Sequence, residues 1–143
     1  EFSFWWEKSK NKNQKSILDN IPFTLPAYLQ ANKIQKKVAS VGFEYQNDLE
    51  AIKKVQEEIK ELKFEIKNNN KNKIKEELGD LIFATLDVSR KLKLNPETIL
   101  KKANIKFVNR WKKLEKIGRK EKLNLNDISM KKYNEMWKKV KIY

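Results

Sequence analysis

Carboxylates in two short clusters are the residues of this chain best suited to chemistry. The clusters are Glu57-Glu58-Ile59-Lys60-Glu61 and Glu76-Glu77-Leu78-Gly79-Asp80. Each cluster places acids three or four residues apart within an apolar period of helical type, and on a helix this spacing puts them on one face. Two such helices side by side would offer about four oxygen donors to a hard divalent cation.

A helical wheel places these acids unequally around the two predicted helices. On the first helix, Glu58 and Glu61 lie at the edge of the apolar seam, whereas Glu57 points away from it. On the second helix, Glu77 borders the seam and shares a strip with Asp80. Acid clusters on helices are often solvated faces with lysine partners, so geometry alone leaves metal binding and a plain surface equally open.

The absence of histidine and cysteine narrows the kind of metal that could bind. A chain without His has no histidine-based zinc site, no Ser-His-Asp triad and no di-iron centre of the Glu-x-x-His type. A chain without Cys has neither a thiolate site nor a disulfide. Any metal is therefore held by oxygen, which favours Mg²⁺, with Mn²⁺ as the alternative.

The elements that must position these acids are helices. Three Gly and three Pro are too few for a turn-rich β domain, so the composition predicts an all-α antiparallel helical bundle. Hydrophobic residues make up 39% and charged residues 36% of the chain, a balance that suits helices completing their burial against a partner subunit. We expect an irregular lead over residues 1–24 and one helical domain over residues 25–143.

The apolar periodicity and the cap signals predict five helices. Four are expected over residues 26–41, 48–67, 73–92 and 96–117, and the last holds Tyr133, Met136, Trp137 and Val140. The stripe of the second helix is Ile52, Val55, Ile59, Leu62 and Ile66. Gly118 is expected to end the fourth helix, and Gly79 to allow close approach of a neighbouring backbone.

The net charge of +14 suggests nucleic acid as a partner, but the types of basic residue in the chain argue against it. Of the 33 basic residues only Arg90, Arg110 and Arg119 are arginine, the residue that base readers favour. Residues 101–143 carry 15 basic and 4 acidic side chains, which suits a ligand that brings its own negative charge and a metal. No apolar run approaches the roughly 20 residues of a membrane span, and the start is too short and acidic for a signal peptide, so we expect a cytoplasmic protein.

The sequence resembles the MazG family of nucleoside triphosphate pyrophosphohydrolases, and the resemblance covers nearly the whole chain. The matching blocks are Lys33-Ile34-Gln35-Lys36-Lys37 with Val41-Gly42-Phe43, the two acid clusters with Leu81-Ile82-Phe83 after the second, and Lys101-Lys102-Ala103-Asn104-Ile105-Lys106-Phe107 with Arg110. Bacterial members often carry two tandem copies of the domain, and this chain resembles the C-terminal, catalytic copy. The paired motifs E-E-x-x-E and E-x-x-D are the family's hallmark.

The resemblance implies a tightly dimerising all-α bundle that cleaves a nucleoside triphosphate between the α and β phosphates. The residues matching the family's Mg²⁺ ligands are Glu58, Glu61, Glu77 and Asp80. The residues expected to contact the substrate are Lys73, Asn104, Lys106, Arg110 and Trp137. Glu57 is the candidate general base, and loss of the Glu61 carboxylate is expected to abolish turnover.

Two departures from the family pattern concern the substrate and the acid strip. Many members read G-F-D-W where this chain has Gly42-Phe43-Glu44-Tyr45, which leaves the base preference open. Asp87 replaces a residue that is often neutral; it could join a second metal site or pair with Arg90, and we expect the pairing. The alternatives are a noncatalytic helical dimerisation domain and a basic helical protein that binds nucleic acid.

Overall fold

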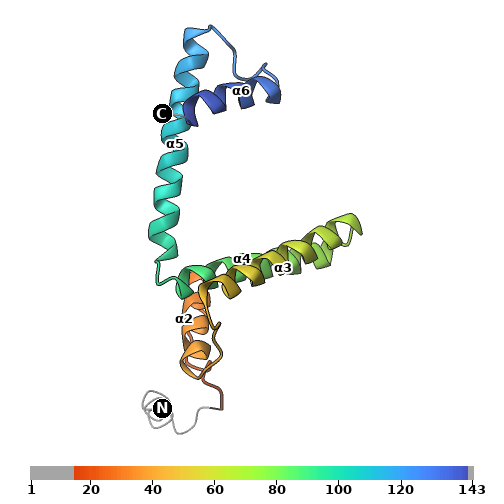
Figure 1. The fold of residues 1–143 in the computed structure, drawn as a ribbon, viewed down its shortest axis with the longest axis vertical. Coiled ribbons are helices and arrows are strands. Elements are labelled where there is room, and N and C mark those ends of the chain that lie inside the picture. Colours follow the sequence, from red (N-terminus) through yellow and green to blue (C-terminus); the bar gives the residue numbers. More distant parts are fainter. Residues whose placement is uncertain (1–14, 142–143) are drawn as a thin grey trace. The chain divides into compact units, whose positions relative to one another are not determined.

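The computed structural model describes residues 15–141, and every regular element within them is an α-helix (Figure 1). The helices are α2 (Ala27–Ser40), α3 (Asp48–Lys67), α4 (Lys71–Lys91), α5 (Pro96–Lys120) and α6 (Met130–Lys141). The predicted all-α class is confirmed for this part of the chain, and residues 1–14 of the predicted lead lie outside it. The described chain forms two compact units, which divide between Pro96 and Glu97.

Helices α3 and α4 form an antiparallel hairpin joined by a short turn (Figure 1). Asn47 caps α3 by accepting a 3.0 Å hydrogen bond from the backbone N–H of Glu50. Asn70 caps α4 in the same way through the N–H of Lys73, and Asn69 makes the turn with a positive φ of 55°. Because Asn70 takes the cap, α4 begins at Lys71, two residues before the predicted start.

The buried face of α3 coincides with the predicted apolar stripe only in part, through the half-buried Val55 and Leu62. Ile52, Ile59 and Ile66 are 40%, 38% and 52% exposed, whereas Ala51 and Glu58 are buried. The face that meets the rest of the unit is therefore rotated from the centre of hydrophobicity, and it carries a carboxylate within the seam rather than at its edge. A helical wheel locates apolar residues, but it does not say which of them a neighbouring helix covers.

Helix α2 packs against α4 within the first unit. Its buried residues are Ala31 and Gln35, and the side-chain Nε2 of Gln35 donates a 2.9 Å hydrogen bond to the backbone carbonyl of Phe83 on α4. Gly42, with φ of 103°, supplies the left-handed conformation that follows the helix end. The first predicted helix is thus confirmed to within one residue at each end.

The second unit is the α5–α6 pair, and its core lies at the C-terminal half of α5. The fully buried residues are Leu114, Met136 and Val140, and Trp111 and Tyr133 stack beside them with ring centroids 5.9 Å apart. The predicted last helix is confirmed, with Met136 and Val140 on its buried face. Residues 101–109 of α5 are all exposed within the described chain.

The predicted end of the fourth helix at Gly118 is wrong. Helix α5 continues through Gly118 to Lys120. A glycine is needed at position 118 for space, because a Cβ there would lie only 3.1 Å from Cδ2 of Leu125. Gly118 therefore serves packing, and the chain turns at Lys122, whose φ is 54°. At Gly79 nothing among the described residues comes within 4 Å of the place that a Cβ would occupy, so the predicted close approach of a backbone is not made within residues 15–141.

Candidate functional site

Three carboxylates converge where α3 and α4 pack together. Glu58 on α3 and Glu77 and Asp80 on α4 each place one oxygen within 4.8 Å of the others. The two α4 residues share a face because they are three positions apart, and the antiparallel hairpin brings Glu58 to that face. The structure thus brings together three of the four predicted metal ligands.

Two oxygens of this cluster are buried without a hydrogen-bond partner among the described residues. Glu58 is only 6% exposed, and its Oε1 lies 3.0 Å from the Nζ of Lys54. Its other oxygen, Oε2, and the Oε2 of Glu77 accept no hydrogen bond from the described chain. Buried carboxylate oxygens without donors are costly, and a coordinated cation would satisfy them. The donor set therefore fits a hard divalent metal.

The fourth predicted ligand, Glu61, is not among the three carboxylates that converge, but it affects the pKa of Glu77. Burial raises the pKa of Glu77 to about 7, with further increases from a hydrogen bond with Glu61 and from the charges of Glu61, Glu58 and Asp80. Like charges held close together raise the pKa of a carboxylate in this way. A bound cation would relieve the repulsion.

The remaining residues of the two acid clusters stay outside this centre. Glu57 has a side chain that is 55% exposed, and its Oε2 lies 4.0 Å from Lys54, on the outer side where the wheel placed it. Glu76 is exposed and forms an ion pair with Lys73 at 3.4 Å. Lys73, expected to contact phosphate, is thus directed at Glu76 in the described chain.

A pocket of about 730 Å³ opens from the carboxylate cluster toward α2. Glu58 and Asp80 line it together with residues of α2 and of the segment between α2 and α3. The other residues that matter for its chemistry are Gln35, Phe43, Tyr45, Lys54 and Phe83. The segment that departs from the family pattern, residues 42–45, therefore forms part of the pocket wall.

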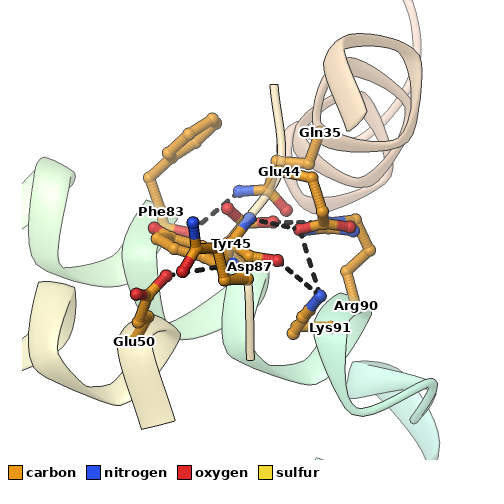
Figure 2. Close-up of polar contacts among 9 residues, drawn as sticks. Gln35, Glu44, Tyr45, Glu50, Phe83, Asp87, Arg90 and Lys91 are labelled. Carbon is orange, nitrogen blue, oxygen red and sulfur yellow. Dashed lines mark hydrogen bonds and ion pairs between the residues drawn. The ribbon is translucent and has the colours of Figure 1, made fainter. Parts of the chain in front are cut away.

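Arg90 on α4 holds residues 42–45 in place through hydrogen bonds. Arg90 donates two 2.8 Å hydrogen bonds to the carboxylate of Glu44, and Lys91 donates one of 2.7 Å to the Tyr45 carbonyl (Figure 2). The hydrogen bonds from Arg90 lower the pKa of Glu44 to about 2. The hydrogen bonds that Arg90 makes to Glu44 and Asp87 in turn raise the pKa of Arg90. The predicted pairing of Asp87 with Arg90 is confirmed.

The predicted substrate-binding residues Asn104, Lys106, Arg110 and Trp137 all lie in the second unit. Lys106 and Arg110 line a shallow hollow of about 450 Å³ on α5. Asn104 is exposed on the same helix. Trp137 of α6 is half-buried and packs against Phe107, with ring centroids 5.1 Å apart. The two units each hold part of the predicted set.

Residues 46–115 match the MazG nucleotide pyrophosphohydrolase domain. The chain belongs to the MazG family. The match runs from the start of α3 into α5, and it includes the carboxylate cluster, Lys106 and Arg110. The family resemblance expected from the sequence is confirmed.

Several curated relatives align with almost all of this MazG chain. It is 38% identical to the nucleoside triphosphate pyrophosphohydrolase of Escherichia coli (strain K12), over 95% of this chain and 54% of that protein. It is 36% identical to the nucleoside triphosphate pyrophosphohydrolase/pyrophosphatase MazG of Thermotoga maritima, again over 95% and 54%. The chain therefore spans about half the length of these relatives. It is also 37% identical to the protein YabN of Bacillus subtilis (strain 168), over 92% of this chain and 27% of that protein.

Two polar side chains that line this MazG pocket, Lys54 and Gln35, were not predicted as site residues from the sequence. Lys54 was detectable, because it stands one helical turn before Glu58 and i,i+4 pairs of opposite charge attract. Gln35 gave a weaker signal. It follows Ala31 by four residues on the apolar side of α2, where a polar residue is expected to need a partner.

Proposed function

We propose that this chain hydrolyses nucleoside triphosphates between the α and β phosphates, giving the nucleoside monophosphate and pyrophosphate. The observation that carries the proposal is the carboxylate cluster of Glu58, Glu77 and Asp80, of which Glu58 and Asp80 line a pocket large enough for a nucleotide. Membership of the MazG family and the names of the relatives support it.

The residues that would hold a metal in this centre are Glu58, Glu61, Glu77 and Asp80, and Mg²⁺ is the ion that an all-oxygen donor set favours, with Mn²⁺ as the alternative. When bound, such an ion neutralises the triphosphate and lowers the pKa of a coordinated water. The two partnerless oxygens, on Glu58 and Glu77, leave the centre in need of positive charge.

Basic side chains supply the charge that the phosphate oxygens of the substrate require. Lys106 and Arg110 present an ammonium and a guanidinium one turn apart on α5, and an Arg fork can bind phosphate bidentately. Lys54 already lies against the carboxylate cluster and in the pocket wall. We include Lys73, Asn104 and Trp137 as further substrate contacts.

Glu57 is the proposed general base. It precedes the ligand Glu58 directly, and its exposed carboxylate is not a member of the buried cluster. In that role its carboxylate takes a proton from the attacking water, which requires the side chain to turn from its outer position toward the centre. Lys54 lies 4.0 Å from its Oε2 and helps to orient the carboxylate.

We also propose a homodimer, in which residues 25–143 act as one domain. The apolar side chains left exposed on α3 and α4 support this, since Ile59, Ile66, Leu78 and Ile82 are 38–56% exposed. The open space beside Gly79 lies next to two of them and would admit a close partner helix. None of the helices in residues 15–141 is long and apolar enough to cross a membrane, and the cytoplasmic location stays a prediction.

The test is to offer each common and noncanonical nucleoside triphosphate with Mg²⁺ and to identify the products. Pyrophosphate and the monophosphate are expected. Orthophosphate and the diphosphate would mean that another bond is cleaved. A Glu61→Gln variant with an unchanged circular dichroism spectrum should lose turnover, and full activity of that variant would overturn the ligand assignment.

A further inference from the structure

One polar side chain of the pocket has no part in the proposed hydrolysis. Gln35 of α2 is only 3% exposed, and it lines the same pocket as Glu58 and Asp80. Its Nε2 donates a 2.9 Å hydrogen bond to the Phe83 carbonyl of α4 (Figure 2). The amide is therefore held in place by the backbone of the helix that carries two of the proposed metal ligands.

The other end of this amide lacks a partner. Oε1 of Gln35 is buried and accepts no hydrogen bond from any described residue. Rotating the amide does not help, because Oε1 would then face the Phe83 carbonyl oxygen and two acceptors would meet. Gln35 thus presents a fixed acceptor, and a buried acceptor needs a donor from elsewhere.

The position of Gln35 along the pocket indicates which part of a nucleotide lies beside it. Phe83 follows Asp80 by three residues, which is about 4.5 Å along the axis of α4. The acids at one end suit a cation and the phosphates. The lining also includes the apolar side chains of Ile34, Val38 and Phe43, and the charges of Glu44 and Asp87 are paired with Arg90. This apolar part of the lining suits a ring face.

We propose that Gln35 selects the nucleobase, with its Oε1 accepting a hydrogen bond from an N–H of the base. The inference rests on the proposed function, since it assigns the nucleoside to the apolar part of the same pocket. An exocyclic amine or a ring N–H of the base donates a hydrogen bond to this oxygen. If the base instead presents only acceptors to Oε1, two acceptor atoms face each other and no hydrogen bond forms. Sites built around a hydrogen bond to the substrate reject analogues that lack the donor more strongly than apolar pockets reject a missing methylene.

The experiment compares each nucleotide with an analogue that lacks the N–H donor. Suitable pairs are ATP with purine riboside triphosphate, CTP with 2-pyrimidinone riboside triphosphate, and UTP with N3-methyl-UTP. For at least one pair, kcat/KM of the unmodified protein for pyrophosphate release should fall roughly 10- to 100-fold when the donor is removed. Calorimetric binding of the α,β-methylene form of each nucleotide, in the presence of Mg²⁺, measures the same selection without turnover.

Two variants separate selection from packing. Gln35→Met keeps the side-chain length and removes the acceptor, so the difference within the sensitive pair should disappear. Gln30→Met is the matched control. Gln30 also lies on α2 and donates its amide to backbone carbonyls, at Phe23 and Leu25, but it does not line the pocket, so its variant should retain the difference.

The outcomes distinguish this inference from the proposed function. Absence of pyrophosphate release with every nucleotide would overturn the hydrolysis, while the binding series would still measure selection. If the unmodified protein shows the same kcat/KM and the same affinity for both members of every pair, the role of Gln35 is overturned. It is also overturned if the difference within the sensitive pair is as large in Gln35→Met as in the unmodified protein. A uniform loss of activity in Gln35→Met, with the same ratio within each pair, would make Gln35 a packing residue only.

Discussion

Arg90 and Glu44 are joined by two parallel hydrogen bonds of 2.8 Å between a guanidinium and a carboxylate. The residues stand 46 positions apart, and the Arg90 side chain is only 10% exposed. The pair therefore ties the segment between α2 and α3, which forms one wall of the pocket, to the C-terminal part of α4. Two-pronged contacts of this kind fix direction as well as distance.

Glu44→Gln should destabilise the fold in a pH-dependent way. Glu44 has a pKa of about 2 in the folded chain against an ordinary value of 4.5, so its contribution is complete above pH 4.5 and is lost as the pH falls toward 2. Because solvent partly screens the pair, we expect about 1 to 2 kcal/mol at pH 7. Urea unfolding at pH 7 and at pH 2.5 measures the difference in the free energy of unfolding between the two proteins, which should shrink at the lower pH.

Glu76→Gln is the control, since the ion pair of Glu76 with Lys73 is exposed. An equal loss of unfolding free energy in Glu76→Gln would show that the Glu44 pair does not stabilise the fold more than an exposed pair does.

Glu77→Gln should weaken the response to Mg²⁺, while Glu76→Gln should leave it unchanged. The two glutamates are neighbours on α4, but only Glu77 belongs to the carboxylate cluster. Removing one charged oxygen donor from such a centre should raise the Mg²⁺ concentration needed for half-maximal pyrophosphate release by about tenfold or more. Similar behaviour of both variants would contradict the assignment of Glu77 as a ligand.

Divalent metal should stabilise the folded chain even without nucleotide. A ligand that binds only the folded state adds about 2.7 kcal/mol at one hundred times its dissociation constant. Thermal unfolding in excess Mg²⁺ and in EDTA should therefore give a higher Tm with the metal, and the increase should be reduced in Glu58→Gln. An unchanged Tm at millimolar Mg²⁺ and Mn²⁺ would argue that the buried oxygens of Glu58 and Glu77 are not ligands.

Lys106→Ala and Arg110→Ala should raise KM for the triphosphate by about tenfold or more, since each removes a charged hydrogen bond to phosphate. Lys112→Ala provides the matched control, because it removes the same charge from an exposed position of α5. Steady-state kinetics at fixed ionic strength will compare the three. Equal changes in all of them would mean that net charge alone attracts the substrate, as the nucleic-acid alternative predicts.

Ile82→Glu should convert a dimer into a monomer of 17.1 kDa. Ile82 is 56% exposed on α4, and a charge there could not be buried against a partner without a large cost. Light scattering after size-exclusion chromatography measures the mass. Phe23→Glu alters a side chain that is 88% exposed ahead of α2 and should leave the mass unchanged. A monomeric unmodified chain would refute the proposed homodimer.

The sequence by itself determined the helices and the acids that they carry. Caps such as Asn47 and the local apolar period define α3 through interactions a few residues long, so its predicted bounds of 48–67 match the structure. The convergence of Glu58 with Glu77 was also foreseeable, because a short turn makes consecutive helices antiparallel neighbours. The pairing of Asp87 with Arg90 is local in the same sense, since the two are three residues apart.

Only the tertiary structure decided which face of each helix is buried and which distant groups meet. Ile59 and Ile66 belong to the apolar stripe expected on α3, yet both are exposed and the covered face carries Glu58. Gly118 serves close packing with Leu125 rather than the helix end. Arg90 meets Glu44, and Gln35 meets the Phe83 carbonyl, across 46 and 48 residues. Such contacts depend on how whole helices pack, and no interaction within a few residues of either partner encodes them.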